Sequence, residues 1–107
     1  MEGQQKIQQM QFLEQNLQAI LMQKQTLQME LNENISALKE IEKSEDTIYK
    51  VIGQLMISVP KDRTIEDLKN KEKLNSTRLK ALEKQEEALQ NQVQSLREDV
   101  MNSSNNN

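Results

Sequence analysis

Two long stretches of the chain carry apolar residues at alternating steps of three and four, which places them along one stripe of an α-helix. The first stripe runs from Met10 to Ile41, and the second from Ile65 to Val100. An a/d repeat of this kind predicts helices that pair along a narrow seam, as in a coiled coil. Because each helix needs a partner and the chain supplies both, we expect an antiparallel helical pair.

Polar residues interrupt both stripes. Lys24 and Asn34 stand at seam positions of the first stripe, and Glu72, Asn75 and Glu86 at those of the second. Polar seam residues cost stability but favour one alignment of the helices. The sequence leaves the alignment itself open, since Lys24 and Asn34 could each face different residues of the second helix.

Composition excludes several classes of protein. Only 35% of the 107 residues are hydrophobic and 2% aromatic, which is too little for a compact globular core. The formal net charge is −3 and no Lys/Arg cluster stands out, so we expect no nucleic-acid partner. The chain has neither Cys nor His, the commonest metal ligands and acid-base groups. We therefore expect no enzyme, no metal and no cofactor.

The first residues, "MEGQQKIQQM", contain no apolar core of a signal peptide. No run in the chain approaches the ~18 apolar residues that a membrane span needs. We therefore expect a soluble, cytoplasmic protein without a membrane partner.

The segment "TIYKVIGQLMISVPK", residues 47–61, does not have the pattern of a polar helix. Two apolar runs flank Gly53-Gln54, and Gly at the first of two turn positions is typical of a type II′ turn. The pattern predicts a β-hairpin with five-residue strands, although Gly53-Gln54 could instead be part of a bulge. Pro60 suits the end of an edge strand because it has no N–H to donate.

Both faces of this hairpin would carry apolar side chains, more than one pair of helices can cover. A lone two-stranded hairpin is marginal in water, and its outer edges carry unpaired N–H and C=O groups. Pairing with hairpins of other chains would satisfy both needs. The residues expected to form this assembly surface are Ile48, Tyr49, Val51, Ile52, Gly53, Leu55, Met56, Ile57 and Val59.

The second helix is expected to begin at Thr64, because Thr64 followed by Asp67 resembles a capping box. The expected organisation is one domain, residues 1–107, with a helix at 4–46, a β-hairpin at 47–60, a helix at 64–101 and a disordered tail at 102–107.

Two stretches resemble a known family. "IYKVIGQLMISVPKDRTIEDL" resembles the signature of β-class prefoldin subunits, in which Tyr-Lys, two apolar residues and Gly precede an aliphatic strand and an acidic helix start. "LKALEKQEEALQNQVQSL", residues 79–96, is similar to the second helix of that family. The single hairpin indicates the β class, because α-class subunits carry two, and the compact loop favours an archaeal β subunit over a eukaryotic one.

The resemblance implies an ATP-independent holdase chaperone. It would be a hexamer of two α and four β subunits whose hairpins form β-barrels. Its coiled-coil arms would hold non-native client proteins at their tips and deliver them to a group II chaperonin. The implied fold class is mainly α, a long antiparallel helical hairpin with a central β-hairpin that forms an inter-subunit β-barrel.

If the arms hold clients, the apolar side chains near both termini are the candidates. Most of them could simply fill the seam, whereas Phe12 lies off it and would expose an aromatic ring. Leu21, Met22 and Met29 also lie off the seam, where they could contact clients, pack against a neighbouring arm or remain exposed. The expected client-binding residues are Ile7, Met10, Phe12, Leu13, Val93, Leu96, Val100 and Met101.

An alternative from another functional class is a structural coiled-coil scaffold or adaptor. Such a protein would use the β-hairpin to oligomerise but would bind no clients.

Overall fold

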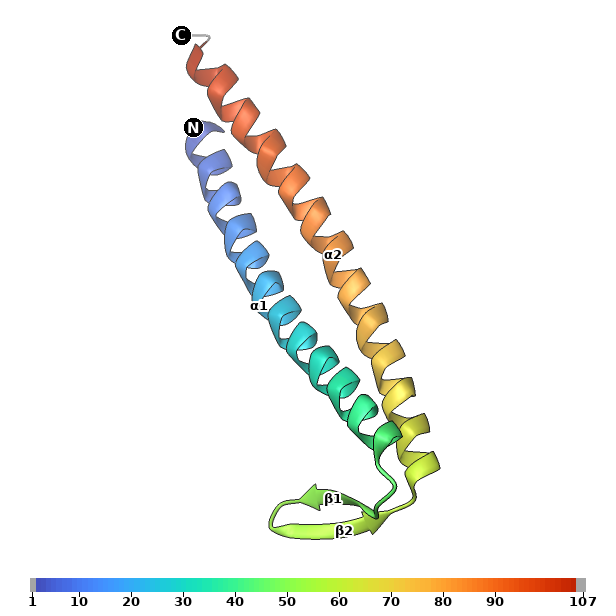
Figure 1. Cartoon of the computed structure of the whole chain (residues 1–107). Helices are drawn as coiled ribbons and strands as arrows, with labels where there is room; N and C mark the ends of the chain where they lie inside the picture. The colour runs from blue at the N-terminus through green and yellow to red at the C-terminus, as the bar shows by residue number, and fades with distance from the viewer. Residues whose placement is uncertain (1, 106–107) are drawn as a thin grey trace. The chain divides into compact units, whose positions relative to one another are not determined.

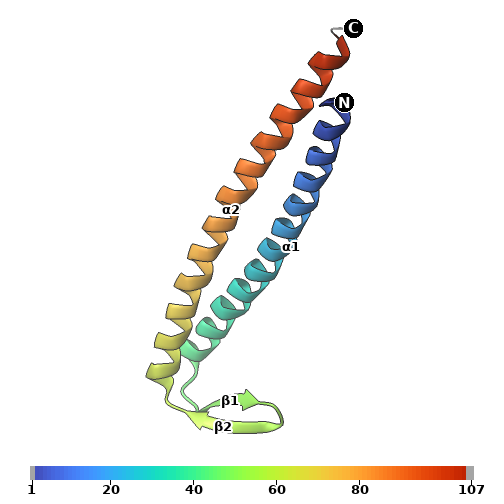
Figure 2. The same ribbon diagram turned by 180° about the vertical axis from the view of Figure 1, so that it is seen from behind.

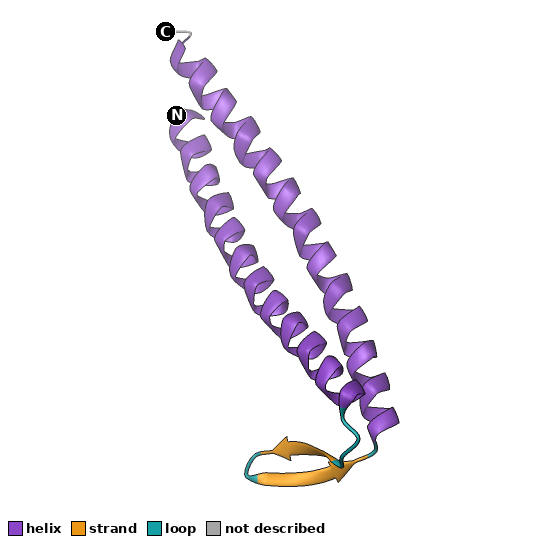
Figure 3. Cartoon of the chain, in the orientation of Figure 1, coloured by secondary structure: helices purple, strands orange, loops and turns teal. Residues whose placement is uncertain are grey.

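The computed structural model describes residues 2–105 of the chain. Its elements follow in the order helix, strand, strand, helix (Figure 3). These are α1 (Glu2–Lys43), β1 (Ile48–Ile52), β2 (Leu55–Val59) and α2 (Lys61–Asn105). This confirms the predicted fold class for the single chain, two long helices with a central β-hairpin, while a barrel requires strands from further chains.

The chain divides into two compact units. The terminal unit joins residues 1–26 to residues 79–107, and the hairpin unit comprises residues 27–78. Each unit therefore contains part of α1 and part of α2. None of the helices within residues 2–105 has a stretch apolar and long enough to cross a membrane.

The predicted seams are confirmed by the burial of side chains along both helices. Every apolar residue of the stripe from Met10 to Ile41 is buried or half-buried, and so is every one from Ile65 to Val100. The core is thin, because only a few apolar side chains of the described residues are buried below about a tenth of their surface. These are Ile20, Leu38 and Val93.

The polar interruptions also lie in the seam. Asn75 is 4% exposed, and Asn34 is half-buried. In the terminal unit Lys24 Nζ donates a hydrogen bond of 2.7 Å to Glu86 Oε2. Two of the three charged interruptions, Lys24 and Glu86, therefore face each other as an ion pair, which offsets the cost of placing either in a seam.

The alignment that the sequence left open is settled in the terminal unit by two ion pairs. Besides the Lys24–Glu86 pair, Arg97 Nη2 lies 3.6 Å from Glu14 Oε1. Moving forward along α1 from Glu14 to Lys24 thus corresponds to moving back along α2 from Arg97 to Glu86. Figures 1 and 2 show the two helices of this unit side by side and antiparallel, as predicted.

Three hydrogen bonds hold the ends of the helices in the hairpin unit. The N–H of Ser44 donates to the carbonyl oxygens of Glu40 and Ile41, which closes the last turn of α1. Lys61 Nζ, from the first turn of α2, donates 2.7 Å to the Ser44 carbonyl oxygen. A cation at a helix C-terminus also opposes the negative end of the helix dipole.

The helix ends differ from the prediction. The first helix ends at Lys43 rather than at residue 46, and α2 begins at Lys61 rather than at Thr64. The Thr64 hydroxyl donates 2.8 Å to the Pro60 carbonyl oxygen instead of capping the N–H of Asp67, because Thr64 already lies within the first turn of α2, where a Thr hydroxyl can bond back to the carbonyl four residues earlier.

The end of α2 also differs from the expected disordered tail at 102–107. The helix continues to Asn105, so residues 102–105 are helical. Residues 106–107 lie outside the described part of the chain.

The β-hairpin has the predicted tight turn and no bulge. The strands pair antiparallel from Ile48 with Val59 to Ile52 with Leu55, so that Gly53 and Gln54 alone form the loop. Gly53 has φ of 60°, and no non-Gly residue among 2–105 has positive φ. Positive φ at the first loop position alone is the requirement of a type II′ turn.

Exchanging the charges of Lys24 and Glu86 is predicted to preserve the ion pair and most of the stability. Lys24→Glu should lower the melting temperature by several degrees, because two carboxylates then meet in the seam. Adding Glu86→Lys should restore most of the loss. Circular dichroism at 222 nm measures the effect, and a double variant no more stable than Lys24→Glu would contradict it.

The same pair predicts a dependence on pH. The hydrogen bond to Glu86 raises the pKa of Lys24 above its ordinary 10.5, aided by the charges of Glu86 and Glu83 and opposed by partial loss of water. A lysine whose pKa is raised in the folded chain contributes stability at pH values below the pKa of the unfolded chain. This contribution is lost as the pH rises through the pKa of the folded chain. Wild type should therefore lose more stability than Lys24→Met in that alkaline range.

Candidate functional site

The ten strand residues of the β-hairpin divide into two faces. Alternation along the strands and the cross-strand pairs place six residues on one face: Ile48, Lys50, Ile52, Leu55, Ile57 and Val59. Tyr49, Val51, Met56 and Ser58 lie on the other. Only Ile48 and Val59, at the base of the hairpin, are half-buried.

The rest of the hairpin is exposed. Val51 is 67% exposed and Met56 68%, although they form a cross-strand pair. Large apolar side chains are therefore exposed on both faces of one short hairpin, which soluble monomers rarely show as a contiguous patch. The exposed members are Tyr49, Val51, Ile52, Leu55, Met56 and Ile57.

The strand edges have free backbone groups. The pair closing a two-residue turn is hydrogen-bonded, and such pairs alternate with non-bonded ones along an antiparallel ladder. From the Ile52–Leu55 pair outward, the N–H and C=O groups of Tyr49 and Val51 therefore point away from β2. The β1 edge is open to another strand.

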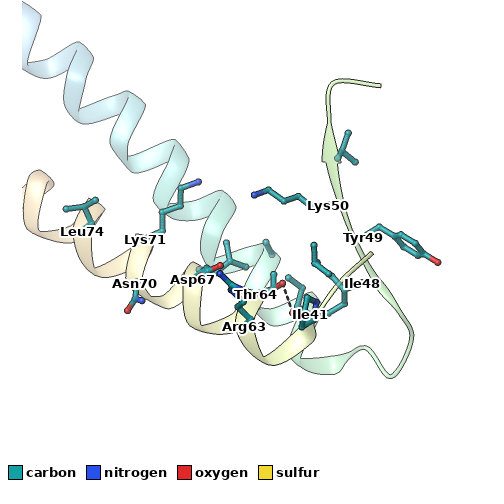
Figure 4. A pocket seen from close by; sticks show the side chains of 15 residues that line it. Ile41, Ile48, Tyr49, Lys50, Arg63, Thr64, Asp67, Asn70, Lys71 and Leu74 are labelled. Carbon is teal, nitrogen blue, oxygen red and sulfur yellow. Dashed lines mark hydrogen bonds between the residues drawn. The ribbon is translucent and has the colours of Figure 1, made fainter. Parts of the chain in front are cut away.

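A groove of about 870 Å³ lies between the hairpin and the helices of the hairpin unit (Figure 4). Ile48 to Val51 of β1, with Val59 of β2, line one side, and the face of the hairpin that carries Lys50 is turned towards the helices. The helices contribute the other side, including Ile41 from α1 and Leu68 and Leu74 from α2. The groove thus lies between one face of the hairpin and apolar side chains of both helices.

Charged side chains line the same groove. Lys50, Arg63, Asp67 and Lys71 belong to it, three cations and one carboxylate. In Figure 4 the Lys50 side chain extends from the hairpin towards the helices, whereas Tyr49 points the opposite way. Within residues 2–105, none of the four lies within 4.0 Å of an opposite charge, since the ion pairs found there are Lys24–Glu86 and Glu14–Arg97.

The terminal unit has a smaller hollow of about 370 Å³. Phe12, 62% exposed, forms its rim, with Leu13 and Leu96 beside it. The carboxamide side chains of Gln9 and Gln92 complete the lining. The hollow thus combines apolar surface with neutral hydrogen-bonding groups and no charge.

The predicted client-binding residues fall into two groups. Ile7, Phe12 and Met101 are exposed, as expected for residues that could meet another protein. Val93 is 7% exposed and belongs to the core. The other seam residues of the set are half-buried and form the second group together with Val93; they are Met10, Leu13, Leu96 and Val100. The structure brings Phe12, Leu13 and Leu96 together around the hollow.

Sequence reasoning missed several residues of these surfaces. Leu74 is exposed in the groove, and its apolar side chain in a charged helix, off the seam, was the available signal. Gln9 and Gln92 gave no signal among many glutamines. Outside the hairpin, the off-seam Leu21, Met22 and Met29 are exposed. Within the described residues no cluster of three or more His, Cys, Asp or Glu side chains could hold a metal.

A family model described as prefoldin subunit matches residues 4–106, nearly the whole chain. The chain belongs to the prefoldin family. Prefoldins are chaperones, and they assemble as hetero-oligomers of α and β subunits.

The similar prefoldins are β subunits. Prefoldin subunit beta of Thermococcus onnurineus is 40% identical over 81% of this chain and 77% of its own length. That of Pyrococcus furiosus is 36% identical over 86% and 80%. The crystal structure of the prefoldin beta subunit from Thermococcus strain KS-1 matches with a TM-score of 0.87 and 34% identity over 95% of this chain and 91% of that one. These relatives are archaeal, in keeping with the resemblance seen in the sequence.

Neighbouring residues of the terminal unit should differ sharply in their effect on stability. Phe12→Ala should change the free energy of unfolding by less than about 0.5 kcal/mol, because the ring is exposed. Leu13→Ala should lower it by about 2 kcal/mol, because Leu13 fills the seam. Urea unfolding followed by circular dichroism measures both. Equal losses would mean that Phe12 is part of the core.

Proposed function

We propose that this chain is the β-type subunit of a cytoplasmic holdase that binds non-native proteins without ATP and passes them to a group II chaperonin. The chain would assemble through its β-hairpin with α-class and further β-class subunits into a hexamer of two α and four β chains. Its terminal unit would hold the client.

Assembly through the hairpin is supported by the exposure of its apolar side chains. If three of the six exposed ones became buried, the gross gain would be roughly 5–9 kcal/mol per chain at ~1.5–3 kcal/mol each, before ordering costs. The open edge of β1 adds unpaired backbone groups that a neighbouring strand would satisfy. A closed sheet of hairpins, a β-barrel, removes all such edges.

Client holding is supported most directly by the hollow at Phe12. An exposed aromatic ring beside Leu13 and Leu96 offers apolar surface to a non-native chain. The Gln9 and Gln92 carboxamides can donate to and accept from peptide groups that are unpaired in an unfolded segment. Because neither is charged, the hollow imposes no charge requirement on the client.

Weak contacts would suffice for such a function. An assembly presents several terminal units. A client bound to one of them meets the others at a high effective concentration and is therefore retained. Met22, which is flexible and 69% exposed, suits further contacts with varied sequences.

The hairpin should fail to assemble when a charge is placed on either face. Val51→Asp or Ile57→Asp, in a complex co-expressed with an α-class subunit, should shift the mass to smaller species, because burying an unpaired carboxylate costs several kcal/mol. Native mass spectrometry measures the shift. Gln54→Asp, in the turn of the same hairpin, is the matched control and should leave the mass unchanged. A full-size complex from both strand variants would refute assembly through this surface.

The assembled complex should suppress light scattering of a denatured, aggregation-prone client without ATP. Deleting residues 1–12 and 94–107 should abolish this activity and leave the assembly size unchanged. A wild-type complex that suppresses nothing would instead favour the scaffold function.

A single change tests the hollow itself. Phe12→Gln should weaken each client contact up to about tenfold, the factor that corresponds to 1.4 kcal/mol. Met29→Gln is the matched control, because Met29 is as exposed as Phe12 but lies outside the hollow. Equal losses of holding activity from the two variants would argue against the hollow as the client site.

A further inference from the structure

The groove of the hairpin unit has the size and the lining of a site for a small molecule. Its volume of about 870 Å³ falls within the range of ligand pockets, which are mostly apolar with a few polar groups. Leu74 in this lining is 49% exposed, so an apolar body in the groove would cover surface that the chain leaves open to water. The apolar side chains come from the hairpin and from both helices, and they are Ala37, Ile41, Ile48, Val51, Val59, Leu68 and Leu74.

Two ammonium groups face each other across this groove. In Figure 4 the side chain of Lys50 extends from the hairpin and that of Lys71 from α2, and the two point towards one another. Neither forms an ion pair within residues 2–105. Like charges that point at one another repel, whereas an anion placed between them would be attracted by both.

The combination of charge and apolar surface indicates the class of ligand. Arg63 is a third cation of the lining and Asp67 is its carboxylate, so the groove carries net positive charge. An inorganic anion would leave the apolar lining uncovered, and a neutral hydrocarbon would leave the cations without a partner. A molecule with an apolar body and one anionic head satisfies both, because its head accepts charge-assisted hydrogen bonds from ammonium and guanidinium groups.

We propose that this groove binds a small amphipathic anion, with the anionic head of the ligand between Lys50 and Lys71. The apolar body of the ligand would lie against Ile41, Leu68 and Leu74. Because the ligand would contact the hairpin and α2 together, its binding would hold the hairpin against the helices. The site depends neither on client holding nor on assembly with other chains.

Sodium decanoate is the probe, and two molecules with the same alkyl tail are its controls, the uncharged decyl glucoside and the cationic decyltrimethylammonium. Each is titrated into the full chain by calorimetry, below its micelle-forming concentration. Decanoate should bind at least about tenfold more tightly than either control, because only its head accepts hydrogen bonds from the cations. Equal affinities would mean that the tails merely adsorb to the exposed apolar hairpin. That result, or binding to phosphatidylglycerol vesicles without binding of decanoate, would overturn the proposal.

Two double variants locate the anionic head. Lys50→Gln with Lys71→Gln should weaken the binding of decanoate at least about tenfold and leave that of decyl glucoside unchanged. Lys69→Gln with Lys73→Gln removes the same charge from exposed residues of α2 outside the groove, and decanoate should bind to it as to wild type. An equal loss from both double variants would mean that only the net charge of the chain matters, which contradicts the proposed site.

A variant that should bind more tightly makes the test independent of folding defects. Asp67→Asn removes the carboxylate that lines the groove, and it should strengthen the binding of decanoate several-fold, because this carboxylate repels the anionic head. Glu66→Gln changes the adjacent exposed residue outside the groove and should leave the binding of decanoate unchanged. No gain from Asp67→Asn, or the same gain from Glu66→Gln, would place the head elsewhere and refute the site.

Discussion

The seam between α1 and α2 is one side chain deep, and the rest of the molecule depends on that limit. Each helix directs a single stripe of apolar residues inward, and few apolar side chains of the described residues, such as Val93, are nearly fully buried. A seam this thin has no spare surface with which to cover a second apolar element. The β-hairpin consequently keeps its apolar side chains on both faces in contact with solvent, and a partner must supply the cover that a larger domain would find within itself.

The two units expose apolar surface of different kinds. In the hairpin unit, such surface accompanies an ordered strand edge and the cations Lys50 and Lys71, which form no ion pair within residues 2–105. A partner strand there would have to match the backbone hydrogen-bonding register as well as the charge. In the terminal unit, the exposed apolar surface accompanies the neutral carboxamides of Gln9 and Gln92 around Phe12. These groups require neither a strand register nor a charge on the partner. Under the proposed function, the first arrangement would suit one defined neighbour and the second many unrelated segments. The same chain would then combine a specific surface with a permissive one.

Much of this could be predicted from the sequence, because the dominant signals are periodic and local. The steps of three and four predicted the stripes from Met10 to Ile41 and from Ile65 to Val100, and Gly53 predicted the turn type, since few residues tolerate positive φ. The start of α2 could not be found, because Thr64 bonded back to Pro60 and the capping pattern with Asp67 was coincidental. The hollow and the groove could not be predicted from the sequence either. Each is made by residues distant in sequence, such as Phe12 with Leu96, and becomes visible only when the alignment of the helices is known.

The hydrogen bond from Lys61 Nζ to the Ser44 carbonyl oxygen has a kinetic consequence. It closes the base of the segment that contains both strands, so the hairpin is a short loop of chain whose contacts are local in sequence. Local contacts cost little loop entropy, and isolated hairpins form in about 1–10 μs. Encounters between chains at micromolar concentration are far slower. In the proposed assembly, the strands therefore pair many times before a neighbouring subunit arrives, so that recognition would act on the paired strands rather than on an unfolded segment.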